Sequence, residues 1–173
     1  FVVAEAGINH NGSLQIAKKM VDQAKKIGVD AIKFQTFKTE EFNSNKKYFK
    51  IFKNAELAYN EFEELSDYAK SKEIIFFSTP FSEKSADVLY KLKVPMFKIA
   101  SGDITHTPLL KHIASMKKPV IISTGMSNLR EIKKSIDIVK KEKNNKIILM
   151  HSVSAYPTPY NEVNMMAMNL LKE

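Results

Sequence analysis

Six short apolar segments, separated by longer amphipathic ones, alternate along the chain. The apolar segments predict strands at residues 1–8, 30–37, 74–81, 96–101, 119–125 and 146–153. The amphipathic segments predict helices near residues 14–27, 56–71, 83–92, 108–116 and 129–141, with the start of a further helix from residue 161. Strands that are apolar on both faces and separated by helices are typical of parallel βαβ units.

Two stretches need a separate interpretation. Residues 38–54 are polar, and we expect them to form a long loop of the kind that is usually functional or mobile. Met165, Met166 and Met168 lie in the last predicted helix, and their simplest interpretation is packing in the core.

Polar residues at the strand ends favour a barrel over an open sheet. No predicted strand is followed by the G-x-G-x-x-G or G-x-x-x-x-G-K-[ST] loop that a nucleotide-binding open sheet often carries. The polar residues at or near the carboxyl ends of the strands are Glu5, Lys33, Gln35, Ser78, Thr79, Lys98, Ser101, Ser123, Thr124, His151 and Ser152. In a barrel all these ends converge on one mouth, where the chemistry takes place.

The sequence therefore predicts an α/β fold, a (β/α)8 TIM barrel. A barrel of this type takes about 250 residues. We therefore expect residues 1–173 to be a partial TIM-barrel catalytic domain, truncated after about six βα units.

Composition argues against several classes of protein. The 173 residues include no cysteine, which rules out disulfides and thiolate metal sites and suits the cytoplasm. No apolar run approaches the roughly 18 residues of a membrane span, and the first residues do not resemble a signal peptide. The net charge is +8, yet Arg130 is the only arginine, whereas nucleic-acid grooves usually recruit arginines and stacked aromatics. We expect no nucleic-acid or membrane partner, and a basic surface that attracts an anionic small molecule.

A lysine interrupts the fourth predicted strand. Residues 95–103 read PMFKIASGD, in which Lys98 lies within an apolar run and is followed at once by a Ser-Gly turn. A buried ammonium loses hydration worth several kcal/mol, so it normally meets an anion or a carboxylate, or its pKa falls. Lys98 is therefore a candidate functional residue.

Two more charged residues occupy comparable positions in other strands. Because residues two apart in a strand share a face, we expect Glu5, Lys33 and Lys98 to enter one barrel cavity. Two cations against one carboxylate leave a net positive pocket, which suits an anionic ligand. Neutral donors to a phosphate or carboxylate would come from Thr79, Ser101 and Ser123 and from the backbone of Gly102 and Gly125. The alternative is that Glu5 only forms a structural ion pair with one lysine.

Six motifs, in this order and at these strand ends, point to a known family. They are FVVAEAGINHNGS, IKFQTF, STPFS, FKIASGD, ISTGMS and SAYPTPY, and they span residues 1 to 160. The chain resembles the sialic acid synthase family, which includes the legionaminic and pseudaminic acid synthases. The resemblance implies an aldolase-type barrel followed by a small antifreeze-like domain, and a full-length protein that is a homodimer. The resemblance stops after the sixth strand.

The resemblance also implies roles for individual residues. The residues implied to bind phosphoenolpyruvate are Lys33, Thr79, Lys98, Ser101 and Ser123. Glu5 would face the sugar, where it orients the acceptor or handles a proton, so that Glu5 and Lys98 are the predicted catalytic residues.

Four further residues lie in the matching motifs. Tyr156 is implied to line the substrate site, and Gln35 to support the lysines. Ser154 stands where many bacterial members of the family carry an asparagine, so the hydrogen bond there would be shorter or made through water. His10 belongs to the opening motif, and we interpret it as a rim or loop-shaping residue rather than a base.

The implied activity is that of a transferase that forms a carbon–carbon bond. Phosphoenolpyruvate would condense with N-acetylmannosamine, its 6-phosphate or a diacetamido hexose to give a nine-carbon keto acid and phosphate. A divalent metal, Mn²⁺ or Mg²⁺, would polarise the sugar aldehyde. The two histidines that bind it in the family lie beyond the sixth strand, so no metal ligand is expected in this chain. His151 is interpreted as a core or supporting histidine.

Two other functions remain open on the sequence alone. A Schiff-base aldolase of similar barrel fold would use Lys98 as a nucleophile after burial lowers its pKa. The phosphate-binding donors around Lys98 favour a charged lysine instead. A non-catalytic fragment would bind the anion or the sugar without turnover. The identity of the acceptor sugar does not follow from the sequence.

Overall fold

The computed structural model describes residues 1–42 and 45–172, and the chain forms two compact units. The first unit is Phe1–Pro95 and the second is Met96–Glu173. Each unit contains three of the six predicted strands, with helices between them.

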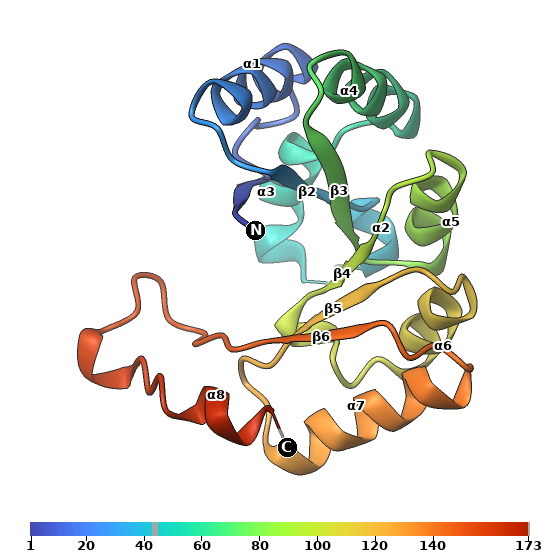
Figure 1. The fold of residues 1–173 in the computed structure, drawn as a ribbon. Helices are drawn as coiled ribbons and strands as arrows, with labels where there is room; N and C mark the ends of the chain where they lie inside the picture. Colours follow the sequence, from blue (N-terminus) through green and yellow to red (C-terminus); the bar gives the residue numbers. More distant parts are fainter. Residues whose placement is uncertain (43–44, 173) are drawn as a thin grey trace. The chain divides into compact units, whose positions relative to one another are not determined.

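The first unit is built on three parallel strands that lie side by side in chain order (Figure 1). They are β1 (Val3–Gly7), β2 (Ala31–Thr36) and β3 (Ile75–Pro80), and β2 pairs with both of the others. The helices of this unit are α1 (Leu14–Lys26), α2 (Thr39–Phe42), α3 (Lys46–Ala55), α4 (Tyr59–Ser71) and α5 (Glu83–Lys91). Helices α1 and α4 pack against each other.

The second unit repeats this plan. Its parallel strands are β4 (Phe97–Ile99), β5 (Val120–Ser123) and β6 (Ile147–Met150), with β5 in the middle. The helices that follow β4 and β5 are α6 (Thr107–Ser115) and α7 (Leu129–Lys141), which contact each other, and a short 3-10 turn, η1 (Ser101–Asp103), precedes α6. Among the described residues, no helix is both long and apolar enough to span a lipid bilayer.

Local sequence signals explain where the helices begin and which face they bury. The buried face of α1 consists of Ala17, Val21 and Ala24. At its start, the hydroxyl of Ser13 accepts a hydrogen bond from the backbone N–H of Ile16 (3.3 Å). At the start of α7, the side chains of Asn128 and Glu131 each accept the other's backbone N–H, at 3.0 and 2.9 Å. These caps satisfy N–H groups that a helix cannot satisfy by itself.

The six predicted strands and five predicted helices are all present, with ends that differ by up to three residues. The strands are shorter than predicted because residues at both predicted ends lie outside the ladder. Ser101, for example, already belongs to the turn η1 rather than to β4.

The prediction of a loop at residues 38–54 is wrong, because this stretch contains α2 and α3. Residues 43 and 44 lie outside the described residues. Phe42 of α2 and Phe52 of α3 pack with Phe37 and Phe81, which follow β2 and β3, at ring-centroid distances of 5.0 to 6.1 Å. Aromatic rings bury large apolar areas, so this aromatic cluster fixes both helices against the strand ends.

A carboxylate anchors the end of the same stretch. Glu56 accepts hydrogen bonds from Nζ of Lys38 (2.7 Å), from the backbone N–H and hydroxyl of Thr39 (2.9 and 3.0 Å) and from Nζ of Lys53 (3.3 Å). Burial raises the pKa of Glu56, but the hydrogen bonds donated to it outweigh burial and lower the pKa to about 2. Glu56 is therefore ionised at neutral pH and ties both ends of the stretch together.

The segment after β6 also differs from the prediction. Instead of a helix from residue 161, it contains a 3-10 turn, η2 (Tyr160–Glu162), and a four-residue helix, α8 (Ala167–Leu170). Met165, Met166 and Met168 are 60%, 72% and 42% exposed, so their assignment to the core is wrong. A helix gains most of its stability from packing a buried face, and α8 has no buried residues.

Candidate functional site

In the first unit, three predicted site residues come together on neighbouring strands. Glu5 of β1 and Lys33 of β2 are register partners, and Nζ of Lys33 lies 2.6 Å from Oε2 of Glu5. Lys33 is 9% exposed and also donates a hydrogen bond to Oγ1 of Thr79 in β3 (3.0 Å). The predicted common face of Glu5 and Lys33 is confirmed. Gln35 is the register partner of Thr79, and its support of the lysines stays a prediction.

Gly7 makes room for the Glu5 carboxylate. It has a φ of +55° and lies where the pairing of β1 with β2 shifts register. A Cβ atom at this position would lie 3.2 Å from Oε1 of Glu5, which is closer than ordinary van der Waals contact. The Glu5 side chain is 49% exposed, so its carboxylate is held by Lys33 and still open to a ligand.

In the second unit, Lys98 lies beside the hydroxyl of Ser123, which is linked in turn to Ser152. It is 6% exposed, and its Nζ donates to the carbonyl oxygen of Ile99 (2.8 Å) and to Oγ of Ser123 (2.5 Å). Oγ of Ser152 donates to Oγ of Ser123 (3.2 Å), and Ser123 donates toward Sδ of Met150 (3.7 Å). The structure thus brings Lys98 and Ser123 together.

Two more serines crowd Gly125, at the turn after β5. A Cβ atom on Gly125 would lie 2.8 Å from Oγ of Ser101 and 2.6 Å from Oγ of Ser154. Real Cβ atoms do not approach other atoms this closely, so both hydroxyls lie directly against the backbone at Gly125. We call Lys98, Ser101, Ser123, Ser152 and Ser154 the hydroxyl cluster.

Two residues near Lys98 received no role in the sequence analysis. Burial raises the pKa of Asp103, and the nearby His106 and Lys98 act in the opposite direction. Asp103 is the last residue of the Ser-Gly-Asp turn η1. The signal for Asp103 in the sequence was its position next to the predicted site residues. For Ser152 the signal was its place just beyond the carboxyl end of a strand, although its partner cannot be inferred from that.

His10 shapes the loop after β1, as predicted. Its side chain is 1% exposed, and its Nδ1 accepts a hydrogen bond from the backbone N–H of Gly12 (3.2 Å). Burial lowers the pKa of His10, and Glu61 acts against that shift. His10 is therefore a neutral, buried residue that fixes the backbone. Its Nε2 has no hydrogen-bond partner within residues 1–42 and 45–172.

Tyr156 is highly exposed. It lies in the segment after β6 and is 96% exposed. Its predicted contact with a substrate stays a prediction.

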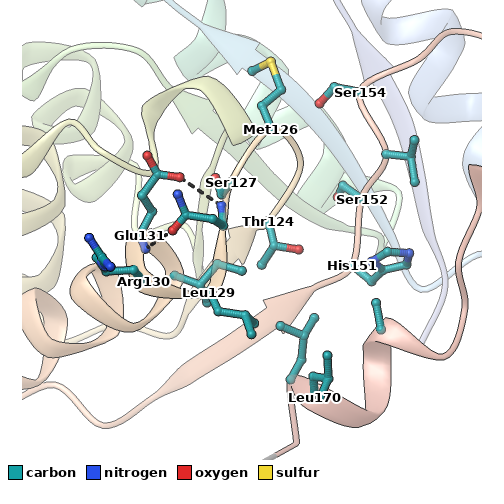
Figure 2. A pocket seen from close by; sticks show the side chains of 15 residues that line it. Thr124, Met126, Ser127, Leu129, Arg130, Glu131, His151, Ser152, Ser154 and Leu170 are labelled. Atoms are coloured by element: carbon teal, nitrogen blue, oxygen red, sulfur yellow. Dashed lines mark hydrogen bonds between the residues drawn. The ribbon is translucent and has the colours of Figure 1, made fainter.

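A cavity of about 1200 Å³ lies beside the hydroxyl cluster (Figure 2). Its walls come from the turn after β5, the amino end of α7 and the segment after β6. Thr124, Ser152 and Ser154 line it, whereas Lys98 and Ser123 do not. The members of the hydroxyl cluster that line this cavity are therefore Ser152 and Ser154, the two serines that follow β6.

The described part of the chain does not fit a metal. It contains no group of three or more His, Asp or Glu side chains that could hold a metal ion. Nε2 of His151 lies 2.7 Å from the carbonyl oxygen of Val163, so this nitrogen is already used within the chain. No metal ligand is assigned here.

Comparison with known proteins gives the family. The NeuB family model matches residues 20–173. A diacetyllegionaminic acid synthase of Legionella pneumophila is 43% identical over 100% of this chain and 54% of its own length. An uncharacterized protein of Methanocaldococcus jannaschii is 50% identical over 99% of this chain and 51% of its own length. The chain thus spans about half the length of these curated relatives.

A solved structure gives the fold. The N-acetylneuraminic acid (sialic acid) synthetase of Leptospira borgpetersenii, in complex with citrate, is 39% identical, with a TM-score of 0.95 over 99% of this chain and 60% of that one. The predicted fold class, α/β with six βα units of a TIM barrel, is confirmed. With a family model that matches nearly nine-tenths of its residues, the chain belongs to the NeuB family.

Proposed function

We propose that the full-length protein is a nonulosonic (sialic-type) acid synthase, which condenses phosphoenolpyruvate with an N-acetylated amino sugar to give a nine-carbon keto acid and phosphate. The observation that carries the proposal is the buried ammonium of Lys98, fixed by Ser123. The names of the Legionella and Leptospira relatives support it. The Leptospira structure holds citrate, an organic anion, which agrees with an anion-binding function.

Lys98 is suited to hold the anionic end of phosphoenolpyruvate. The hydrogen bonds to Ile99 and Ser123 fix the ammonium in one position, so the charge does not have to reorganise as the reaction moves negative charge onto the departing phosphate. Ser101 and Ser123 would add neutral donors to the same phosphate and carboxylate oxygens. The family resemblance gives Lys33 and Thr79 a role with the same ligand.

Glu5 is proposed to face the acceptor sugar. Its carboxylate is held by Lys33 at 2.6 Å while half of the side chain is exposed. A carboxylate fixed on one side and open on the other can orient a sugar hydroxyl or take up a proton. The variant Glu5→Gln, in the assay below, is expected to lower kcat more than it raises the KM for phosphoenolpyruvate.

The proposal for the full-length protein extends beyond this chain. Family resemblance implies a divalent metal, Mn²⁺ or Mg²⁺, which would supply a Lewis acid for the sugar aldehyde. It also implies a C-terminal antifreeze-like domain and a homodimer. The absence of cysteine suits a cytoplasmic location. The described residues assign no ligand to the metal.

The deciding experiment is phosphate release by the full-length protein, with Mn²⁺, phosphoenolpyruvate and each candidate amino sugar in turn. We expect release that depends on one sugar, and a fall of about a hundredfold in kcat/KM for Lys98→Ala, because the fixed charge is lost. The matched control is Lys111→Ala, an exposed lysine of α6, which should behave as wild type. Absence of sugar-dependent release with every acceptor would contradict the proposal.

The Schiff-base aldolase is the alternative function. A nucleophilic lysine must first lose a proton, whereas neutral donors such as Ser101 and Ser123 favour a charged Lys98 that is paired with an anion. Borohydride treatment with a keto substrate would add mass only to an aldolase. Binding of phosphoenolpyruvate without turnover would identify a non-catalytic binding protein.

A further inference from the structure

Ser152 makes one hydrogen bond that bears on the proposed site. It lies two residues beyond the end of β6, and its Oγ donates to Oγ of Ser123 at 3.2 Å. The side chain of Ser152 lines the cavity beside the cluster (Figure 2). Ser152 can also donate to the carbonyl oxygen of Met150, at the longer distance of 3.5 Å.

The hydrogen bonds of Ser123 fix the direction of its proton. A serine hydroxyl can accept two hydrogen bonds and donate one. Lys98, which can only donate, occupies one lone pair of Ser123 (2.5 Å), and Ser152 occupies the other (3.2 Å). When Ser152 donates to Ser123, the shorter of its two hydrogen bonds, the proton of Ser123 points away from both donors. The acceptor left for it is Sδ of Met150 (3.7 Å), a weak one.

We propose that Ser152 is a positioning residue, which holds the Ser123 hydroxyl as a hydrogen-bond donor for an anionic oxygen of phosphoenolpyruvate. This inference rests on the proposed function. A ligand oxygen is a far better acceptor than a thioether sulfur, so the Ser123 hydroxyl redirects its hydrogen bond to the ligand without loss of a strong bond. Without Ser152, one lone pair of Ser123 is unoccupied, and its hydroxyl is free to turn its proton elsewhere.

The first test is the kinetics of Ser152 variants of the full-length protein. Ser152→Ala should raise the KM for phosphoenolpyruvate about tenfold, the effect of one misdirected hydrogen bond to an anion. The KM for the sugar and the melting temperature should stay unchanged. Ser152→Thr, which keeps the hydroxyl, should restore the wild-type KM. Ser115→Ala, which removes an exposed hydroxyl of α6 bonded to a carbonyl, is the matched control.

A double-mutant cycle separates positioning from a direct or structural role. If Ser152 acts only through Ser123, then Ser152→Ala should have no further effect on the KM in a Ser123→Ala background. Additive effects of the two substitutions would overturn the inference, and so would equal rises in the KM of both substrates or a failure of Ser152→Thr to restore binding.

Two separate measurements distinguish this inference from the proposed function. Sugar-dependent phosphate release by the wild type decides the function. Calorimetric titration with inorganic phosphate decides the positioning role, because it needs the anion site and no turnover. Tighter binding of phosphate by wild type than by Ser152→Ala, lost in the Ser123→Ala background, supports the role. Equal binding by wild type and Ser152→Ala, or no binding by either, contradicts it.

Discussion

At the residue scale, the backbone of Gly125, in the turn after β5, lies directly against two hydroxyls of the cluster. A Cβ atom added there would lie 2.6 Å from Oγ of Ser154 and 2.8 Å from Oγ of Ser101. Both oxygens are the ends of short side chains that can rotate away, and Cβ of Ser101, 3.3 Å from the added atom, would have to shift only slightly. The fold should therefore tolerate a methyl group at residue 125 better than the arrangement of the cluster does.

The prediction is that Gly125→Ala raises the KM for phosphoenolpyruvate about tenfold, because the Ser101 donor is displaced, while stability falls by less than about 1 kcal/mol. Gly28→Ala is the matched control. Gly28 has a φ of +75° and open space around it, so alanine there should cost about 1 kcal/mol and leave the KM unchanged. Urea unfolding and steady-state kinetics of the full-length protein measure both effects. An unchanged KM in Gly125→Ala would show that the cluster does not bind this substrate.

At the element scale, the clearest departure from the sequence prediction is the pair of helices α2 and α3. The stretch was predicted as a loop because it is polar, although α3 is amphipathic and begins at a capping residue, Asn45. The partners of this stretch in the aromatic cluster, Phe37 and Phe81, lie next to strands and are separated from each other by three helices and a strand. Only the folded sheet brings them together. In contrast, α7 was predicted with its observed bounds, since its signals are local.

The Glu56 anchor predicts an acid-dependent loss of stability. The folded-state pKa is about 2 and the ordinary value is 4.5, so the stabilisation is complete above about pH 4.5 and is lost as the pH falls toward 2. Glu56→Gln should lower the free energy of unfolding by about 1–3 kcal/mol at pH 7. It should also remove part of the decline between pH 4.5 and 2.

Urea unfolding of the full-length protein across this pH range measures the effect of Glu56. Glu63→Gln, at an exposed position of α4, is the control and should change stability by less than about 0.5 kcal/mol. If both variants kept the wild-type pH profile, the anchor would have no energetic role.

At the scale of the whole molecule, the alternation of apolar and amphipathic segments was enough to predict the fold class. It also predicted that Glu5 and Lys33 share a face, because the period of two in a strand fixes side-chain direction. The hydrogen bond between Ser123 and Ser152 was beyond prediction, since it joins residues 29 positions apart through the direction of two hydroxyls. Periodicity places residues on faces but does not orient protons.

The contact between Ser123 and Met150 has a consequence for the oxidation chemistry of the molecule. The chain has eight methionines and no cysteine, so oxidants act on thioethers. Met150, whose sulfur accepts the hydrogen bond of Ser123, is 40% exposed. Hydrogen peroxide would convert its sulfur to a sulfoxide and release water, and the sulfoxide oxygen is a strong acceptor that would hold the proton of Ser123 away from a substrate.

Mild peroxide treatment of the full-length protein should therefore raise the KM for phosphoenolpyruvate in step with oxidation of Met150, followed by mass spectrometry. Met150→Leu should resist this change, whereas Met165→Leu, at an exposed methionine outside the cluster, should not. A KM that stays constant while Met150 is fully oxidised would exclude this sensitivity. The chain has no thiol, and the site is built from serine hydroxyls. It would still be sensitive to oxidation, through the Met150 sulfur that the Ser123 hydroxyl faces.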